Sequence, residues 1–185
     1  MIAYVDESLR LDGEGRYVLA AVLVPDARAD EVRAALRSTL RRGQRRYHWH
    51  DEGPASRLAV TRVVAALGLD AVAVTSTPVD GARQERARRR CLRVLLWEVE
   101  RRGIEYVVLE SRHRPLDLAD AQMIAHAGRA GWISRNLRYA FCRPSEEPLL
   151  WLPDIVSGVV MRALVDRESR YLDLLGARVA TVTAP

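Results

Sequence analysis

The chain has 185 residues, of which 49% are hydrophobic and 29% charged, and its formal net charge is +5. This composition supports a folded core and argues against the disordered and fibrous classes. Every one of the 29 residues in the Lys and Arg class is arginine. Because arginine pairs bidentately with phosphate, the charge is compatible with a nucleic-acid partner but does not by itself require one.

The targeting and redox features of the sequence are plain. The N-terminus has no basic segment followed by an apolar stretch, and no apolar run approaches the roughly 20 residues that span a bilayer. Cys91 and Cys142 are far apart and show no metal-ligand spacing. We therefore expect a cytoplasmic protein with reduced cysteines and no membrane partner.

Strand patterns recur along the chain, and the first two strands are predicted to form a hairpin whose loop contains Gly13 and Gly15. The predicted strands are IAYVDES (2–8), RYVLAAVLVP (16–25), DAVAVTSTPV (70–79), IEYVVLES (104–111), LRYAFC (137–142) and the edge strand ARVATVT (177–183). The continuous apolar run at 104–111 predicts a central strand that is buried on both faces. The final edge strand could pair with a second copy in a homodimer.

Helical periodicity fills the intervals between these strands, and Asp30 is a plausible N-cap of the first helix. The predicted helices are 27–42, 55–67, 81–102, 116–130 and 148–164. The segment YHWHDEGP (47–54) reads as a short strand or loop. This alternation predicts an α/β fold with a mixed sheet flanked by helices, forming one domain over residues 1–185.

Two carboxylates follow apolar strands, Asp6 in IAYVD and Glu110 in YVVLE. If these strands are parallel neighbours, both acids emerge at the same sheet edge and on the same face, where open α/β sheets bind ligands. Asp154 lies near the start of the apolar helix 148–164, where an unpaired carboxylate costs several kcal/mol. A helix lying across the crevice would make Asp154 the third acid of one site.

Three converging carboxylates repel one another unless a cation lies among them. Oxygen ligands alone favour Mg²⁺ or Mn²⁺ over zinc, and two such ions can bind the attacking and leaving oxygens of a phosphodiester. Each acid also has a purely structural interpretation. Asp6 and Glu110 could cap a turn or helix, and Asp154, which follows Pro153, could satisfy N–H groups in the first helical turn.

Three segments resemble the DUF3800 family, whose members have a ribonuclease H-like fold and largely unknown activity. These segments are YVDES with the following YVLAAVLV, VVLESR at 107–112, and LWLPDIVSGVVMRA at 150–163. HWHDE at 48–52 stands where members often have an aromatic and polar strand. The resemblance covers nearly the whole chain in order. It implies a ribonuclease H-like mixed sheet with Asp6, Glu110 and Asp154 as catalytic metal ligands.

The sequence departs from the family pattern at two positions of this site. Glu110 stands where many members carry aspartate, and Pro153 replaces the usual alanine before the helix aspartate. The longer glutamate moves its carboxylate by about one methylene, which bears on two-metal geometry. Glu52 is the best fit to the additional catalytic acid that ribonuclease H-like sites often carry.

Further side chains are candidates for supporting roles or substrate contacts. Glu7 points away from Asp6 on a regular strand and is either a neighbouring ligand or a turn partner. His48 and His50 would share a face if HWHDE were a strand, as a base, a ligand or a substrate contact; otherwise they lie on a polar edge with Trp49 packed inward. Arg112 would share the face of Glu110 if the strand continued and could then hold that carboxylate or contact a phosphate; the alternative is an ordinary surface ion pair.

The segment RQERARRRCLR at 83–93 is a dense basic helix. Arg86, Arg89 and Arg90 are candidate nucleic-acid contacts. The alternative is a solvated face, which an ion pair between Glu85 and Arg89 would support. Downstream, the helical acids Asp117 and Asp120 are expected to be solvated or to cap the helix.

Three functions from different classes remain open at this point. The first is a Mg²⁺- or Mn²⁺-dependent nuclease acting on RNA, DNA or a hybrid. The second is a catalytically inactive module of the same fold that binds nucleic acid or protein. The third is a transition-metal hydrolase built on His48, His50 and Asp154.

Overall fold

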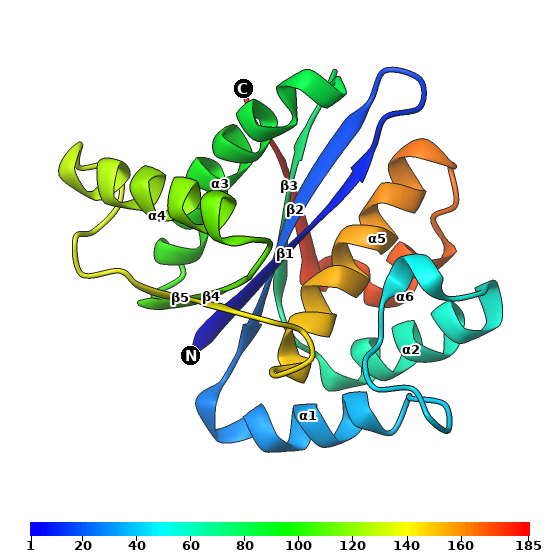
Figure 1. The fold of residues 1–185 in the computed structure, drawn as a ribbon. Coiled ribbons are helices and arrows are strands. Elements are labelled where there is room, and N and C mark those ends of the chain that lie inside the picture. Colours follow the sequence, from blue (N-terminus) through cyan, green and yellow to red (C-terminus); the bar gives the residue numbers. More distant parts are fainter.

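A six-stranded mixed sheet organises the computed structural model, which describes residues 1–185 (Figure 1). The strand order across the sheet is β5-β4-β1-β2-β3-β6. The strands are β1 (Ile2–Arg10), β2 (Arg16–Val24), β3 (Ala71–Ser76), β4 (Tyr106–Glu110), β5 (Arg138–Cys142) and β6 (Val179–Thr183). All six predicted strands are present, and the predicted α/β class with a mixed sheet is confirmed.

β1 and β2 form the predicted antiparallel hairpin, with Asp6 opposite Ala20. Gly13 and Gly15 both have positive φ in its loop, a conformation that glycine adopts without steric cost. A Cβ on Gly15 would lie 1.7 Å from the carbonyl oxygen of Val79. Only glycine therefore lets the hairpin loop lie against the segment after β3.

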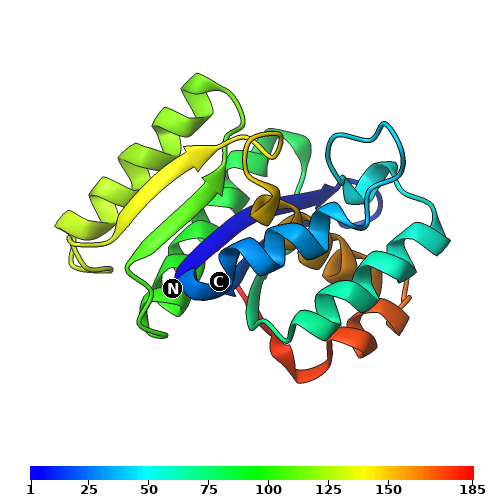
Figure 2. The same ribbon diagram turned by 90° about the horizontal axis from the view of Figure 1, so that it is seen from below.

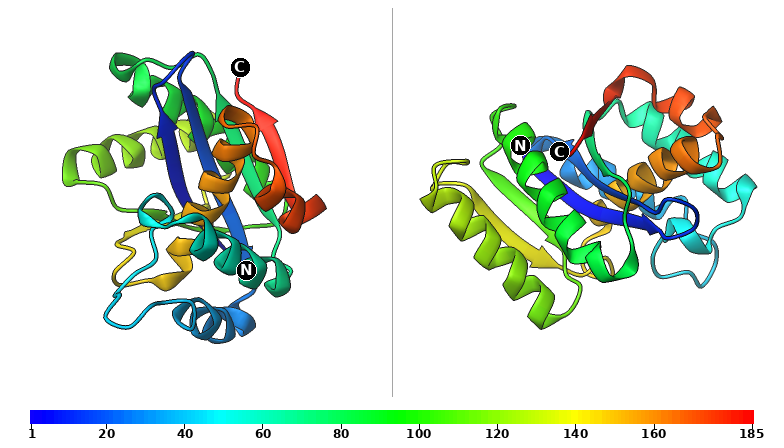
Figure 3. Two further views of the ribbon diagram at one scale, coloured as in Figure 1. Left: turned by 90° about the vertical axis from the view of Figure 1, so that its right-hand side faces the viewer. Right: turned by 90° about the horizontal axis from the view of Figure 1, so that it is seen from above.

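Parallel pairing on both sides of the hairpin makes the sheet mixed. β4 lies beside β1 with Val5 opposite Leu109, and β5 continues parallel to β4. On the other side β3 is antiparallel to β2, and β6 pairs parallel to β3. Figure 3 shows β6 along the outer edge of the sheet, as predicted for ARVATVT.

Helices cover both faces of this sheet. They are α1 (Ala29–Arg37), α2 (Pro54–Leu67), α3 (Gln84–Glu100), α4 (Arg114–Arg129), α5 (Trp151–Val165) and α6 (Arg170–Leu175). Figures 1 and 2 show α3 and α4 on one side, and α1, α2, α5 and α6 on the other. Alternation along β1 feeds both cores, with Val5 packing toward α3 and Tyr4 toward α5.

The sequence misplaced some helix boundaries. The first helix ends at Arg37 instead of residue 42, and Asp30 does not cap it but pairs with Arg33 at 2.9 Å in its first turn. α6 was not predicted. The segment at 48–52 contains a short 3₁₀ helix, Trp49–Asp51, rather than a strand.

α5 is the most apolar helix of the fold. Contrary to the expectation from the sequence, Pro148–Val165 is long and apolar enough to cross a membrane by length and composition, with a mean hydropathy of 1.5. In the structure 72% of this window is buried, and the helix lies against β1 and β2. It thus delivers Asp154 to the face of the sheet that carries Asp6.

Candidate active site

Asp6 and Glu110 lie side by side on adjacent parallel strands. Because Val5 is opposite Leu109, the next residues along the two strands are also neighbours, with Cα atoms about 4.8 Å apart. Both acids share the sheet face of Tyr4 and Val108, which α5 covers. The expectation that the two strands are parallel neighbours is therefore correct.

The third acid reaches this face from α5. Asp154 lies in the first turn of the helix, and its Oδ2 accepts a hydrogen bond of 2.8 Å from the backbone N–H of Trp49. Asp6 is held in a similar way, since its Oδ1 accepts from the N–H of Glu7 at 2.7 Å. Each of these carboxylates thus has one oxygen fixed by the main chain and a second oxygen left for another partner.

A close contact between Trp49 and Gly158 holds the loop against α5. A Cβ on Gly158 would lie 2.2 Å from the Trp49 ring, so the indole packs directly on the helix backbone. Gly158 is one turn beyond Asp154 on the same helix. This contact keeps the N–H of Trp49 within reach of the Asp154 carboxylate.

The pKa values of all three acids are raised. Burial, followed by the charges of Glu110, Glu7 and Asp154, places the pKa of Asp6 well above its ordinary value. Burial raises the pKa of Asp154 to about 6, and burial together with the charge of Asp154 raises that of Glu110. Each carboxylate therefore costs free energy in its charged form.

No arginine forms an ion pair with any of these three acids, and this separates them from most other shielded carboxylates of the protein. Glu7 and Asp120 pair with Arg88, Glu52 pairs with Arg41, and Glu98 pairs with Arg102. Two other half-buried acids, Asp117 and Glu100, also have no arginine partner, but they lie singly at the start of α4 and the end of α3. Asp6, Glu110 and Asp154 instead lie close enough for their charges to raise one another's pKa values. This site carries negative charge without a protein counter-charge.

A divalent cation fits this site by the chemistry of its donors. Three carboxylates with uncompensated charge are the oxygen ligands that Mg²⁺ and Mn²⁺ prefer. No three His, Cys, Asp or Glu side chains, however, stand close enough together to form a ready-made metal cage. Binding an ion would therefore require the three side chains to rotate toward one another.

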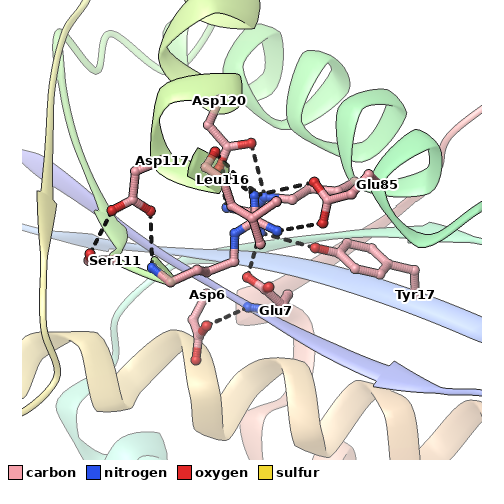
Figure 4. Close-up of polar contacts among 10 residues, drawn as sticks. Asp6, Glu7, Tyr17, Glu85, Ser111, Leu116, Asp117 and Asp120 are labelled. Atoms are coloured by element: carbon pink, nitrogen blue, oxygen red, sulfur yellow. Dashed lines mark hydrogen bonds and ion pairs between the residues drawn. The ribbon is translucent and has the colours of Figure 1, made fainter. Parts of the chain in front are cut away.

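Of the predicted supporting residues, Glu7 lies on the opposite side of the sheet from Asp6 (Figure 4), and Arg112 binds acids of α3 and α4. Glu7 forms an ion pair with the buried Arg88. Arg112 pairs with Glu85 at 2.7 Å and with Asp120 at 3.1 Å, and it makes no contact with Glu110. Of the two interpretations of Arg112, the structure shows ion pairing and no contact with Glu110, because β4 ends at Glu110 and the chain turns toward α4.

The two acids after β4, Asp117 and Asp120, were expected to be solvated or to cap a helix, and only Asp117 does so. Asp117 accepts from Ser111 Oγ at 2.7 Å and from the N–H of Arg112 at 3.0 Å, so it fastens the start of α4 as a capping residue would. Asp120 is neither solvated nor capping. It is 2% exposed and receives hydrogen bonds from both Arg88 and Arg112.

Glu52 is buried but is not brought into contact with the three acids. Its Oε1 accepts from Arg41 at 3.0 Å and from Gln44 at 2.7 Å, which ties the loop after α1 to the fold. Burial and the charges of Glu52 and Asp154 raise the pKa of Tyr47, so both carboxylates lie near this phenol. These contacts show that Glu52 anchors the loop after α1.

The two histidines of HWHDE do not form a metal pair. Trp49 points inward, as the structural alternative predicted, while the His48 and His50 ring centroids are 6.4 Å apart. His48 contacts Asp51 at 3.0 Å, and its charge lowers the pKa of Asp154, so it lies beside the acids. His50 is exposed. The structure therefore does not bring together His48, His50 and Asp154, the three ligands that the transition-metal hypothesis requires.

Sequence reasoning missed Arg46. This exposed side chain forms no ion pair, yet its charge lowers the pKa of both Glu110 and Asp154, which places it near the acids. Arg42 and Arg45 of the same loop are also exposed and without ion pairs. The signal was present in the sequence as RRGQRR (41–46), directly before HWHDE.

The basic helix α3 lies on the other side of the sheet from the three acids. Arg86 and Arg89 are exposed and without carboxylate partners, whereas Arg90 donates to Ser76 Oγ at 2.9 Å. The expected pair between Glu85 and Arg89 is absent because Glu85 binds Arg112. Two of the three predicted nucleic-acid contacts are therefore free to meet a ligand.

Comparison with known proteins identifies the fold of the chain. No protein-family model matches the sequence, so the DUF3800 resemblance has no such support, and no curated protein matches it either. A chain in the PCNA:RNase HII complex from Archaeoglobus fulgidus is 14% identical with a TM-score of 0.56, over 97% of this chain and 80% of that one.

Two structures of Bst-RNase HIII are also similar. A mutant form is 12% identical with a TM-score of 0.56, and the complex with Mn²⁺ is 11% identical with a TM-score of 0.54. Each match covers 94% of this chain but 56% of the other, so the chain spans little more than half the length of those proteins. The chain has a ribonuclease H-like fold, with a mixed six-stranded sheet between two layers of helices.

Proposed function

We propose that this protein is a nuclease that depends on Mg²⁺ or Mn²⁺ and hydrolyses phosphodiester bonds in RNA, DNA or a hybrid. The carrying observation is the trio Asp6, Glu110 and Asp154, three carboxylates with raised pKa values and no arginine ion pair that share one face of a ribonuclease H-like sheet. The DUF3800-like segments contain the same three acids, which supports membership of that family. The Mn²⁺ complex of a structural neighbour agrees with the choice of ion.

The residues of the chain have distinct parts in this proposal. A divalent ion held by the three acids would supply a water that ionises near neutral pH and would neutralise charge on the phosphate. The main-chain N–H groups of Glu7 and Trp49 fix one oxygen each of Asp6 and Asp154, which leaves the other oxygens for the ion. Arg46 and His48, both near Asp154, would attract and orient the phosphate.

The test compares cleavage by wild type and by Asp154→Asn with Mn²⁺ on single-stranded RNA, single-stranded DNA and a hybrid duplex. Asparagine still accepts from the Trp49 N–H but carries no charge, so the fold is retained and cleavage should fall by at least about a hundredfold. The control is Glu105→Gln, which removes an exposed carboxylate just before the other end of β4. Cleavage by Asp154→Asn at the wild-type rate would exclude the proposed site.

A second candidate is an inactive nucleic-acid-binding module of the same fold. It is favoured by the open spacing of the carboxylates and by the unpaired arginines Arg86 and Arg89. Such a module would bind nucleic acid equally well in EDTA and in Mn²⁺, without cleaving any of the three substrates. Its affinity would fall steeply as salt rises, because the arginines would displace counterions from phosphates.

A further inference from the structure

An open groove of about 660 Å³ lies on the α3 side of the sheet, away from the three acids. Its walls come from the second half of α3, the loop after α4, the end of β6 and the C-terminal Pro185. The side chains that define it are Arg93, Trp97, Trp132, Val182 and Pro185. Nothing in the proposed hydrolysis uses this surface.

Two tryptophans give the groove its character. Trp97 and Trp132 are 49% and 45% exposed, whereas Trp49 and Trp151 are buried. Keeping two indoles half in water forgoes a large apolar contribution to folding, because an aromatic side chain buries 150–250 Å² in a core, a typical range. Exposed aromatic surface concentrated in a groove indicates a ligand.

Guanidinium groups accompany both indoles. Arg93 lies over Trp132 with its Cζ 5.3 Å from the ring centroid, and Arg101 lies over Trp97 at 5.1 Å. Tryptophan and arginine planes are the surfaces on which proteins stack unpaired nucleobases. Stacking requires no particular base, so such a groove binds single strands with little sequence preference.

The charge around the groove selects an anionic occupant. Arg86, Arg89 and Arg93 recur at helical spacing along the exposed side of α3 and have no carboxylate partners. The acids nearby are already engaged, since Glu98 pairs with Arg101 and Arg102, and Glu100 accepts the N–H of Ser134 at 2.6 Å. A polyanion with flat apolar groups matches this combination better than a neutral or basic peptide.

We propose that the groove between Trp97 and Trp132 binds unpaired bases of single-stranded nucleic acid, with Arg86 and Arg89 contacting its phosphates. From Arg86 to Trp97 the helix rises by about 16 Å, which accommodates a few nucleotides. This inference rests on the nucleic-acid partner of the proposed function but not on catalysis. It gives the α3 side a binding role separate from the hydrolytic side.

The test is the fluorescence anisotropy of a fluorescein-labelled oligodeoxythymidylate of about twelve nucleotides, titrated with protein in EDTA, where metal-dependent cleavage cannot occur; this length lies within the usual site sizes of single-strand binders. The label reports binding in the tryptophan variants as well as in the wild type, where tryptophan fluorescence gives a second signal. Binding should quench the exposed indoles. Trp97→Ala and Trp132→Ala should each weaken binding about tenfold, as expected for loss of one base stack. Trp97→Phe should retain most of the affinity, because phenylalanine keeps a stacking ring.

The matched control is Leu118→Ala, which removes a 57% exposed apolar side chain from α4 outside the groove and should leave affinity unchanged. Wild-type affinity in the Trp97→Ala/Trp132→Ala double variant would overturn the inference. A wild-type dimer that becomes monomeric in this double variant would overturn it too, by assigning the groove to a second copy of the chain.

The two proposals fail separately. If the protein cleaves nucleic acid with Mn²⁺ but shows no tryptophan-dependent binding in EDTA, only the proposal for the groove is refuted. A protein that binds through both tryptophans but cleaves no substrate loses the nuclease function alone.

Discussion

At the scale of single residues, the charge of Asp154 is the most informative feature of the molecule. An aspartate with an ordinary pKa of 3.8 whose folded pKa is about 6 binds more protons in the folded than in the unfolded state. Stability therefore falls as pH rises from about 4 to above 6. A bound cation would reverse this cost by compensating the charge.

Asp154→Asn should therefore stabilise the metal-free protein. At pH 7 in EDTA we expect the free energy of unfolding to rise by about 2 kcal/mol, because the neutral amide keeps the Trp49 hydrogen bond without the cost of charge. At pH 4 the gain should vanish. Urea unfolding at both pH values measures this, and a variant less stable than wild type at pH 7 would contradict the account.

Asp120 provides the opposite case, a buried carboxylate that is fully compensated. Asp120→Asn leaves Arg88, which is 1% exposed on its side chain, with Glu7 as its only remaining carboxylate, and it also weakens the tie to Arg112. We expect a loss of about 3 kcal/mol in the free energy of unfolding, measured by urea denaturation. Glu31→Gln, which breaks the exposed pair with Arg28, should leave the denaturation midpoint nearly unchanged.

At the scale of elements, the contact of the 3₁₀ helix Trp49–Asp51 with α5 fixes the orientation of the Asp154 carboxylate, which accepts a hydrogen bond from the Trp49 N–H. Gly158 allows this contact, since any side chain there would collide with the Trp49 ring. Alanine in a helix is normally better than glycine by up to about 1 kcal/mol. A loss of stability at this position would thus report the collision directly.

Gly158→Ala should therefore destabilise the fold by about 1–3 kcal/mol and lower cleavage, because it pushes Trp49 away from Asp154. The control is Gly128→Ala in α4, where the nearest atoms to a new Cβ are 3.8 Å away and the substitution should be neutral or stabilising. Thermal unfolding and the Mn²⁺-dependent cleavage rate measure both effects. Equal behaviour of the two variants would refute the proposed clamp.

The β1–β4 pair shows how far local patterns extend. The strand end that carries Glu110 was predicted because apolar periodicity is local information, whereas Asp6 was expected at a strand end and lies in the middle of β1, which continues to Arg10. The adjacency of the two acids followed once the strands were taken as parallel. The fate of Arg112 was not predictable in this way. It depends on where β4 ends and on Glu85 and Asp120, which only the packing of α3 and α4 brings within reach.

At the scale of the whole molecule, the mixed sheet and its helical layers could be predicted from the order of strand and helix patterns, and the structural neighbours confirm a ribonuclease H-like fold. The partners of buried charges could not. Glu52 was predicted from the sequence as an additional catalytic acid, yet Arg41 and Gln44 both donate to its Oε1 and tie it to the loop after α1. Arg46 resembled an ordinary loop residue, yet the fold sets it beside the acids.

The two faces of the sheet have different chemistry on this scale. One face carries the three acids under α5, which form no ion pairs but have Arg46 and His48 nearby. The other face carries the exposed arginines Arg86, Arg89 and Arg93 of α3 and the groove lined by Trp97 and Trp132. Together with the net charge of +5, this division predicts that the protein surface as a whole attracts polyanions such as nucleic acid. It also predicts that divalent cations bind at the three acids.

The most direct test of the central claim is the anomalous scattering of manganese in crystals soaked with Mn²⁺. The account predicts an anomalous peak between the middle of β1 and the end of β4, with carboxylate oxygens of Asp6, Glu110 and Asp154 rotated to within about 2.1 Å of it. Crystals at saturating Mn²⁺ with no peak there, and with the three carboxylates still apart, would contradict it.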